Sequence, residues 1–134
     1  MSKNEKNDSA GRASRDTDEQ FLHDWVIRKI KEKYGRLYKE VHINPGDEKN
    51  YEFKGKYPDA VFVNYGQVVM IVEVETAETV NEGEAEQWRE LSELGVKLSI
   101  IVPKENQKKA REICWDKGLA AKVNITGFGV DLNV

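Results

Sequence analysis

The chain has 134 residues, which is enough for one ordinary domain and too few for two. Hydrophobic residues make up 39% and charged residues 34% of it, as is typical of soluble globular proteins, and its formal net charge of −3 does not favour general nucleic-acid binding. No apolar run approaches the ~18 residues that span a bilayer, so we expect no membrane partner and a cytoplasmic location.

The first sixteen residues are polar and contain no apolar segment. We expect residues 1–16 to form a disordered tail and residues 17–134 to form a single domain. Thr17 and Gln20 have the spacing of a capping box, with Thr17 as the N-cap. Apolar residues then recur at helical spacing as far as Tyr34, so the pattern predicts a first helix that ends at Gly35.

Alternation, apolar periodicity and turn residues predict eight elements in total. The predicted helices cover 18–34, 80–94 and 103–117, and the predicted strands cover 37–43, 59–64, 68–76, 96–102 and 122–126. Tyr65-Gly66-Gln67 joins the second and third strands as a hairpin, and the fourth strand is apolar enough to be covered on both faces. Hairpin strands followed by alternating strands and helices indicate an α/β domain with a mixed sheet.

An acidic pair lies at the end of the third predicted strand. Side chains alternate along a strand, so Glu73 and Glu75 share one face with Ile71. Two carboxylates ~7 Å apart repel each other, and a divalent cation would turn that repulsion into binding. The alternative is that the strand simply runs out into solvent at Glu73.

Asp59 opens the partner strand at the same end of the hairpin. If Tyr65 and Gly66 alone form the loop, Asp59 pairs with Val72 and points away from Glu73. A three-residue loop, or an equivalent bulge, pairs Asp59 with Glu73 on the same face. A metal site at Asp59 and Glu73 therefore requires the longer loop or the bulge.

The acidic pair begins a segment of unusual charge. Residues 73–93 hold eight glutamates and one arginine, whereas the rest of residues 17–134 carries 16 basic and 13 acidic side chains. The segment is either a solvated helix face or, in part, a cation site. Gln87 lies on the apolar stripe of the second helix, so its side chain is either at the core boundary or turned toward a polar site.

These residues resemble the motif of the PD-(D/E)XK nuclease superfamily. The matching pattern is Pro58-Asp59, thirteen intervening residues and Glu73-Val74-Glu75, followed by a helix with an inward Gln87. The resemblance runs from the first helix to about residue 126. It implies a restriction endonuclease-like core of order αβββαβ, with a mixed central sheet flanked by helices.

The resemblance also implies a metal centre. Asp59 and Glu73 would bind Mg²⁺ or Mn²⁺, with the Val74 carbonyl as a further ligand. Glu19 matches an acidic position on the first helix of some branches of the superfamily, and Gln87 matches the helix glutamine of others. The function implied is a Mg²⁺-dependent nuclease that hydrolyses phosphodiester bonds, with DNA as the expected partner, and a homodimer fits this resemblance.

The chain departs from the superfamily at Glu75, where lysine is usual. Some restriction enzymes of the superfamily carry glutamate there and remain active. Glu75 could be the general base for a metal-bound water or an extra ligand, but it cannot supply positive charge. Lys56 and Lys97 are candidates for a displaced lysine. With Asp59, Glu73 and Gln87, Glu75 completes the expected catalytic set.

Two non-enzymatic alternatives remain open at this point. One is a catalytically inactive nuclease-like module that binds or regulates. The other is an accessory protein whose helix acids, Glu82, Glu84 and Glu86, dock a basic partner.

Other residues can be explained by structure alone, without a role in function. His23 lies beside the apolar stripe of the first helix, and we expect it at the surface, while the tryptophans are expected in the core or at its boundary. Two basic clusters are either phosphate contacts or solvated helix faces. The first comprises Lys104, Lys108, Lys109 and Arg111, and the second comprises Lys29, Lys31, Lys33, Arg36 and Lys39.

Overall fold

The computed structural model describes residues 15–130, so residues 1–14 of the expected tail lie outside the described residues. The elements in chain order are α1 (Thr17–Tyr34), β1 (Glu40–Ile43), β2 (Ala60–Asn64), β3 (Gln67–Val74), the 3₁₀ helix η2 (Glu82–Glu84), α2 (Ala85–Ser92), β4 (Lys97–Pro103), the 3₁₀ helix η3 (Lys104–Asn106), α3 (Gln107–Asp116) and β5 (Asn124–Phe128). The predicted order of helices and strands is confirmed. None of the described helices is long and apolar enough to cross a membrane.

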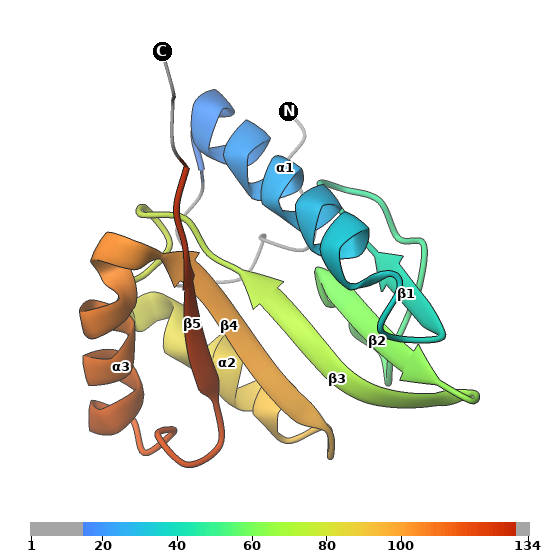
Figure 1. Ribbon diagram of the computed structural model, residues 1–134. Helices are drawn as coiled ribbons and strands as arrows, with labels where there is room; N and C mark the ends of the chain where they lie inside the picture. The colour runs from blue at the N-terminus through green and yellow to red at the C-terminus, as the bar shows by residue number, and fades with distance from the viewer. Residues whose placement is uncertain (1–14, 131–134) are drawn as a thin grey trace.

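The five strands form one mixed sheet in the order β1-β2-β3-β4-β5. The β1–β2 and β2–β3 pairs are antiparallel, and the β3–β4 and β4–β5 pairs are parallel. Helix α1 covers one face of the sheet, and α2 and α3 cover the other (Figure 1). The α/β class with a mixed sheet is therefore confirmed.

Two apolar cores hold these layers together, and alternation along the strands assigns each side chain to one of them. The core beneath α1 includes Ile27, Phe62 and Val72. The core beneath α2 and α3 includes Ile71 and Trp88. Because β4 is central and covered on both faces, it is apolar along nearly its whole length, as predicted.

The helix ends differ from the predictions by short distances. Asp16, rather than Thr17, is the N-cap of α1, because its side chain accepts a hydrogen bond from the Glu19 N–H at 2.8 Å. Helix α2 is shorter than the predicted 80–94. The Thr79 N–H bonds the Thr76 carbonyl at 3.0 Å in a turn, and η2 then leads into the helix.

The β2–β3 hairpin has the short loop rather than the long one. Tyr65 and Gly66 both have positive φ, at 51° and 79°, and Asn64 pairs with Gln67. Two consecutive left-handed residues form the kind of tight turn that matches the twist of a hairpin. By itself this loop would point Asp59 away from Glu73.

A β-bulge reverses that outcome. The register shifts between Phe62 and Val63, so that Ala60 pairs with Val72 instead of Ile71. An extra residue on one strand shifts the register by one, so that each later residue has a new partner on the opposite strand. Asp59, the residue before Ala60, consequently meets Glu73.

Candidate functional site

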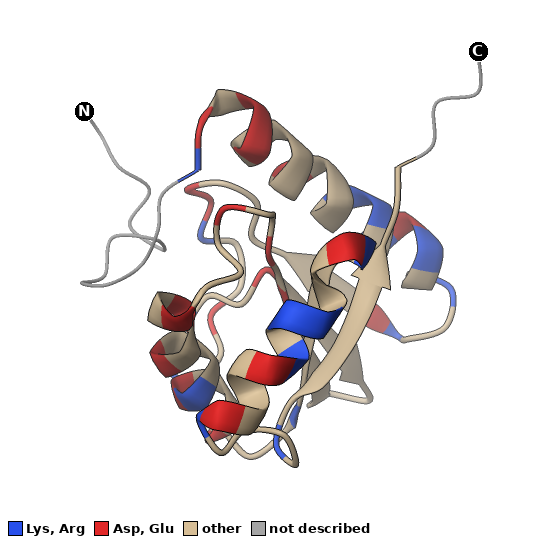
Figure 2. Cartoon of the chain, turned by 90° about the vertical axis from the view of Figure 1, so that its left-hand side faces the viewer, with Lys and Arg blue, Asp and Glu red and all other residues tan. Residues whose placement is uncertain are grey.

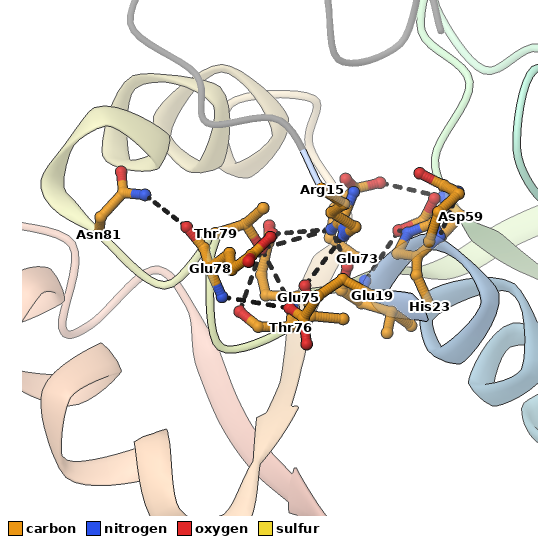
Figure 3. Close-up of polar contacts among 12 residues, drawn as sticks. Arg15, Glu19, His23, Asp59, Glu73, Glu75, Thr76, Glu78, Thr79 and Asn81 are labelled. Carbon is orange, nitrogen blue, oxygen red and sulfur yellow. Dashed lines mark hydrogen bonds and ion pairs between the residues drawn. The ribbon is translucent and has the colours of Figure 1, made fainter. Parts of the chain in front are cut away.

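Asp59 and Glu73 form the centre of the site, and each carboxylate binds the backbone of the opposite strand (Figure 3). The Asp59 N–H donates to Glu73 Oε2 at 2.9 Å, and the Val74 N–H donates to Asp59 Oδ2 at 2.8 Å. Both residues are buried, with 1% and 5% exposure. The alternative in which β3 runs out into solvent at Glu73 is therefore wrong, because the chain folds over this end of the strand.

His23 reaches Asp59 from α1. Its Nε2 lies 3.0 Å from Asp59 Oδ2, and its Nδ1 lies 2.9 Å from Asp24 Oδ1. The side chain is buried, so the expectation of a surface histidine is wrong. With Val26, Ile27 and Ile30 it forms the buried stripe of α1, a spacing that could have placed it inside.

The two carboxylates favour the charged form of His23. Burial lowers the pKa of His23, but the charge of Asp59 and the hydrogen bonds with Asp24 and Asp59 outweigh that effect and raise the pKa above 6.5. Burial likewise favours the neutral form of Asp24, but its hydrogen bond and attraction to His23 lower the Asp24 pKa below its usual value. His23, Asp24 and Asp59 therefore form one hydrogen-bonded cluster, in which the two carboxylates stabilise the protonated histidine.

Glu75 occupies the position where the superfamily has lysine, and it is wholly buried. Oε1 accepts a hydrogen bond from Thr79 Oγ1 at 2.6 Å, and Oε2 accepts one from Trp88 Nε1 at 2.9 Å. Oε1 also lies 3.3 Å from Nη2 of Arg15. Both oxygens are thus held by the protein.

The surroundings of Glu75 favour its protonated form. Burial raises the pKa of Glu75, and the charge of the buried Glu84 raises it further. Attraction to Arg15 and the hydrogen bonds from Thr79 and Trp88 act in the opposite direction, and the resulting pKa is about 7.

Arg15 supplies positive charge from a segment that was expected to be a tail. Besides Glu75, its guanidinium donates to the Val74 carbonyl at 3.1 Å and to Thr76 Oγ1 at 3.1 Å. Its side chain is only 2% exposed. Nothing in a polar, charged segment distinguishes this arginine, and only its position just before the helix cap hinted at contact with the fold.

The remaining predicted residues lie at varying distances from this centre. Glu19 is half-buried near the site, where its Oε1 accepts a hydrogen bond from the Glu78 N–H at 3.3 Å. Gln87 is half-buried on α2, and no hydrogen bond among the described residues joins it to the carboxylates. The expected phosphate contacts are exposed residues at the start of η3 and on α3, namely Lys104, Lys108 and Lys109.

Neither candidate for a displaced lysine reaches Glu75. Lys97 pairs with Met70 at the opposite end of the β3–β4 ladder. The Nζ of Lys56 lies 2.7 Å from Glu90 Oε1 on α2, in a partly exposed ion pair. The described residue that brings a cation to Glu75 is Arg15.

The acidic helix is only partly a surface feature. Glu82 and Glu86 have highly exposed side chains, but Glu84 is wholly buried. The expectation that all three helix acids dock a basic partner is therefore wrong for Glu84. The charge of Glu84 instead acts on the buried Glu75, whose pKa it raises.

The donor atoms at Asp59 and Glu73 suit a hard cation. Within residues 15–130, no three His, Cys, Asp or Glu side chains are arranged as a metal site. Mg²⁺ needs only one or two carboxylates, because water and carbonyl oxygens complete its shell. Asp59, Glu73 and the Val74 carbonyl provide such a set, although Arg15 already donates a hydrogen bond to that carbonyl.

The resemblance to PD-(D/E)XK nucleases depends on element order and on Asp59, Glu73 and Gln87 themselves. No protein-family model, no curated protein and no solved structure matches this chain. Membership of that superfamily, and the restriction endonuclease-like core that it implies, stay predictions. The α/β class and the geometry around the carboxylates stand independently of them.

Proposed function

We propose that this protein is a metal-dependent nuclease that hydrolyses phosphodiester bonds, with DNA as the expected substrate. The observation that carries the proposal is the bulge in the β2–β3 hairpin, with its extra residue on β3, which sets Asp59 across from Glu73 with both carboxylates buried. Buried acids that share a site repel each other, and a divalent cation relieves that repulsion. A divalent cation here would find two carboxylate ligands and would offset their charge.

Asp59, Glu73 and the Val74 carbonyl would hold Mg²⁺ or Mn²⁺. A metal in such a site polarises a phosphate oxygen and lowers the pKa of a bound water. His23 binds Asp59 Oδ2 and orients that carboxylate, as the outer partners of metal ligands commonly do. Its positive charge also offsets part of the charge on the two acids.

Glu75 fits a positioning role better than a general base. A base must reach the attacking water, whereas both Glu75 oxygens are engaged by Thr79, Trp88 and Arg15. We propose that Glu75 holds the Arg15 guanidinium beside Val74. Arg15 then contributes the positive charge that lysine provides in the superfamily.

Calorimetric titration with Mn²⁺ tests the metal site directly. We expect one Mn²⁺ to bind the wild-type protein, with binding lost in Asp59→Asn and Glu73→Gln. Glu90→Gln is the matched control, because it removes an acid that pairs with Lys56 away from the site. Absence of binding, or binding that survives Asp59→Asn, would exclude the metal site and with it the nuclease.

Cleavage then tests the activity itself. The wild-type protein with Mn²⁺ should nick or degrade circular DNA, and Asp59→Asn prepared in parallel should not. Activity that is equal in both preparations would identify a contaminating nuclease and remove the proposal.

A second candidate is a nuclease-like module that binds or regulates without catalysis. The observation that favours it is the 3.1 Å hydrogen bond from Arg15 to the Val74 carbonyl, which puts a cation at an atom that the metal would use. In that case the wild-type protein neither binds Mn²⁺ nor cleaves DNA, whereas Arg15→Ala gains Mn²⁺ binding. The same titration therefore separates the two candidates.

A further inference from the structure

A groove runs between α1 and the edge strand β5, on the face of the sheet that α1 covers. It has a volume of about 310 Å³. Its walls carry three aromatic side chains, Trp25, Tyr34 and Phe128, and two lysines, Lys29 and Lys33. Trp25 is 38% exposed, which is high for a residue of its size and apolarity.

The lysines and the aromatic rings of α1 are interleaved. Lys29 Nζ lies 5.4 Å from the centre of the Trp25 ring, and Lys33 Nζ lies 5.5 Å from that of Tyr34. Trp25, Lys29 and Lys33 follow each other at four-residue spacing, so they form one row along the helix. Flat apolar rings beside mobile cations offer stacking surfaces and phosphate contacts at the same place.

The charge of this region differs from that of the whole chain. Residues 28–39 contain six basic side chains and one acid, Glu32, although the protein carries a net charge of −3. All seven of these side chains are exposed. Figure 2 shows the contrast along α1, with acidic positions near its start and basic positions over its second half. The helix dipole favours cations there, but it does not account for the aromatic groove beside them.

The groove continues along α1 toward the N-terminal half of that helix. A neighbouring hollow shares Phe128 and Gly129 with it and is also lined by Leu22 and Lys104. Leu22 precedes His23, which contacts Asp59. The hollow thus lies beside the part of α1 that contributes His23 to the candidate site.

We propose that the α1–β5 groove binds single-stranded nucleic acid. Bases stack on Trp25 and its aromatic neighbours, and phosphates lie against Lys29 and Lys33. This inference builds on the proposed nuclease function and narrows its substrate to a single strand. A duplex buries the faces of its bases, so it cannot use the aromatic walls in this way.

Fluorescence anisotropy without divalent metal tests the proposal. The probes are labelled oligo-dT and oligo-U of about 12 nucleotides, and a DNA duplex of equal length. We expect the single strands to bind more tightly than the duplex. Trp25→Ala should weaken single-strand binding roughly tenfold, whereas Trp115→Ala, which alters an exposed tryptophan on α3, should not.

Charge reversal provides a test that does not depend on the tryptophan. Lys29→Glu/Lys33→Glu changes two exposed residues that line the groove, and Arg28→Glu/Lys31→Glu makes the same change on the same helix outside it. The lining pair should lower the salt dependence of single-strand binding by about 1.4, since each phosphate contact contributes ~0.7. The control pair should change it much less.

Several results would contradict single-strand binding in the groove. They are absence of single-strand binding, binding that Trp25→Ala leaves unchanged, and equal losses from the two charge-reversal pairs. Sedimentation that shows dimers unable to bind oligo-dT, with dimerisation lost in Trp25→Ala, would also overturn it. Because no metal is present, failure here is distinct from failure of the Mn²⁺ titration.

Discussion

The Arg15 guanidinium and the Glu75 carboxylate form a buried ion pair, with 3.3 Å between Nη2 and Oε1 and side-chain exposures of 2% and 1%. Arg15 also donates a hydrogen bond to the Val74 carbonyl, so the residue before the α1 cap is joined to the end of β3. The pair thus connects the start of the described chain to the strand that carries the candidate site.

Loss of Arg15 should destabilise the fold. In Arg15→Ala, the buried Glu75 carboxylate would lose its ion pair, and we expect the free energy of unfolding at pH 8 to fall by about 3 kcal/mol. Urea unfolding measures this change. Lys29→Ala, which removes an exposed pair with Glu32, should cost less than about 1 kcal/mol. Equal effects of the two variants would contradict a buried role for Arg15.

Stability should decrease as pH rises from about 5 to 7. The pKa of Glu75 is about 7 in the folded protein and 4.5 as the ordinary value, so between these pH values the folded state binds more protons than the unfolded state. The unfolding free energy therefore falls with rising pH across this window. Glu75→Gln should flatten the slope, and Glu90→Gln should not. An unchanged slope in Glu75→Gln would assign the effect to another group.

Loss of the Trp88 hydrogen bond should destabilise the fold even when an aromatic ring is kept at this position. Trp88→Phe keeps most of the apolar volume but removes the donor to Glu75 Oε2, and we expect a loss of about 1–3 kcal/mol. Because that bond lowers the pKa of Glu75, its removal should also extend the pH slope to higher pH. Trp115→Phe, at a ring that is 77% exposed, is the control with little expected change.

His23 should be doubly protonated at pH values above its usual pKa of 6.5. Burial lowers the pKa of His23, but the charge of Asp59 and the hydrogen bonds with Asp24 and Asp59 outweigh it. The stability from the charged form is therefore present below pH 6.5 and lost as pH rises through the raised folded pKa. Nitrogen-detected NMR of the imidazole at pH 6.5 should show more than half of the His23 rings protonated on both Nδ1 and Nε2, and His42→Asn assigns the signals. Asp24→Asn should lower the pKa of His23, and a neutral ring at pH 6 would contradict this arrangement.

Much of the fold could be predicted because local patterns carry it. The apolar run of β4 predicted a strand covered on both faces, and the glycines at 35, 95 and 118 placed the ends of the helices close to where they lie. Asp59 and Glu73 were identified from their spacing along the chain. Their meeting depended on a choice between two registers, which local patterns left open.

The site itself required contacts between distant residues. The register shift between Phe62 and Val63 is decided by how the whole hairpin packs, since a slip of one residue would exchange the strand's side chains between the two cores. Arg15 meets Glu75 across sixty positions of sequence, and no local pattern encodes such a pair.

The sequence by itself determined the order of the elements, the α/β class and the acidic residues at the end of β3, because periodicity and turn residues act over a few positions. Only the tertiary structure decided that His23 is buried against Asp59 and that Glu75 faces Arg15 and Trp88. Burial and electrostatic pairing depend on which side chains the packed layers bring together. Burial and pairing thus determine the pKa and the hydrogen bonds of Glu75, the residue that stands where the superfamily usually has lysine.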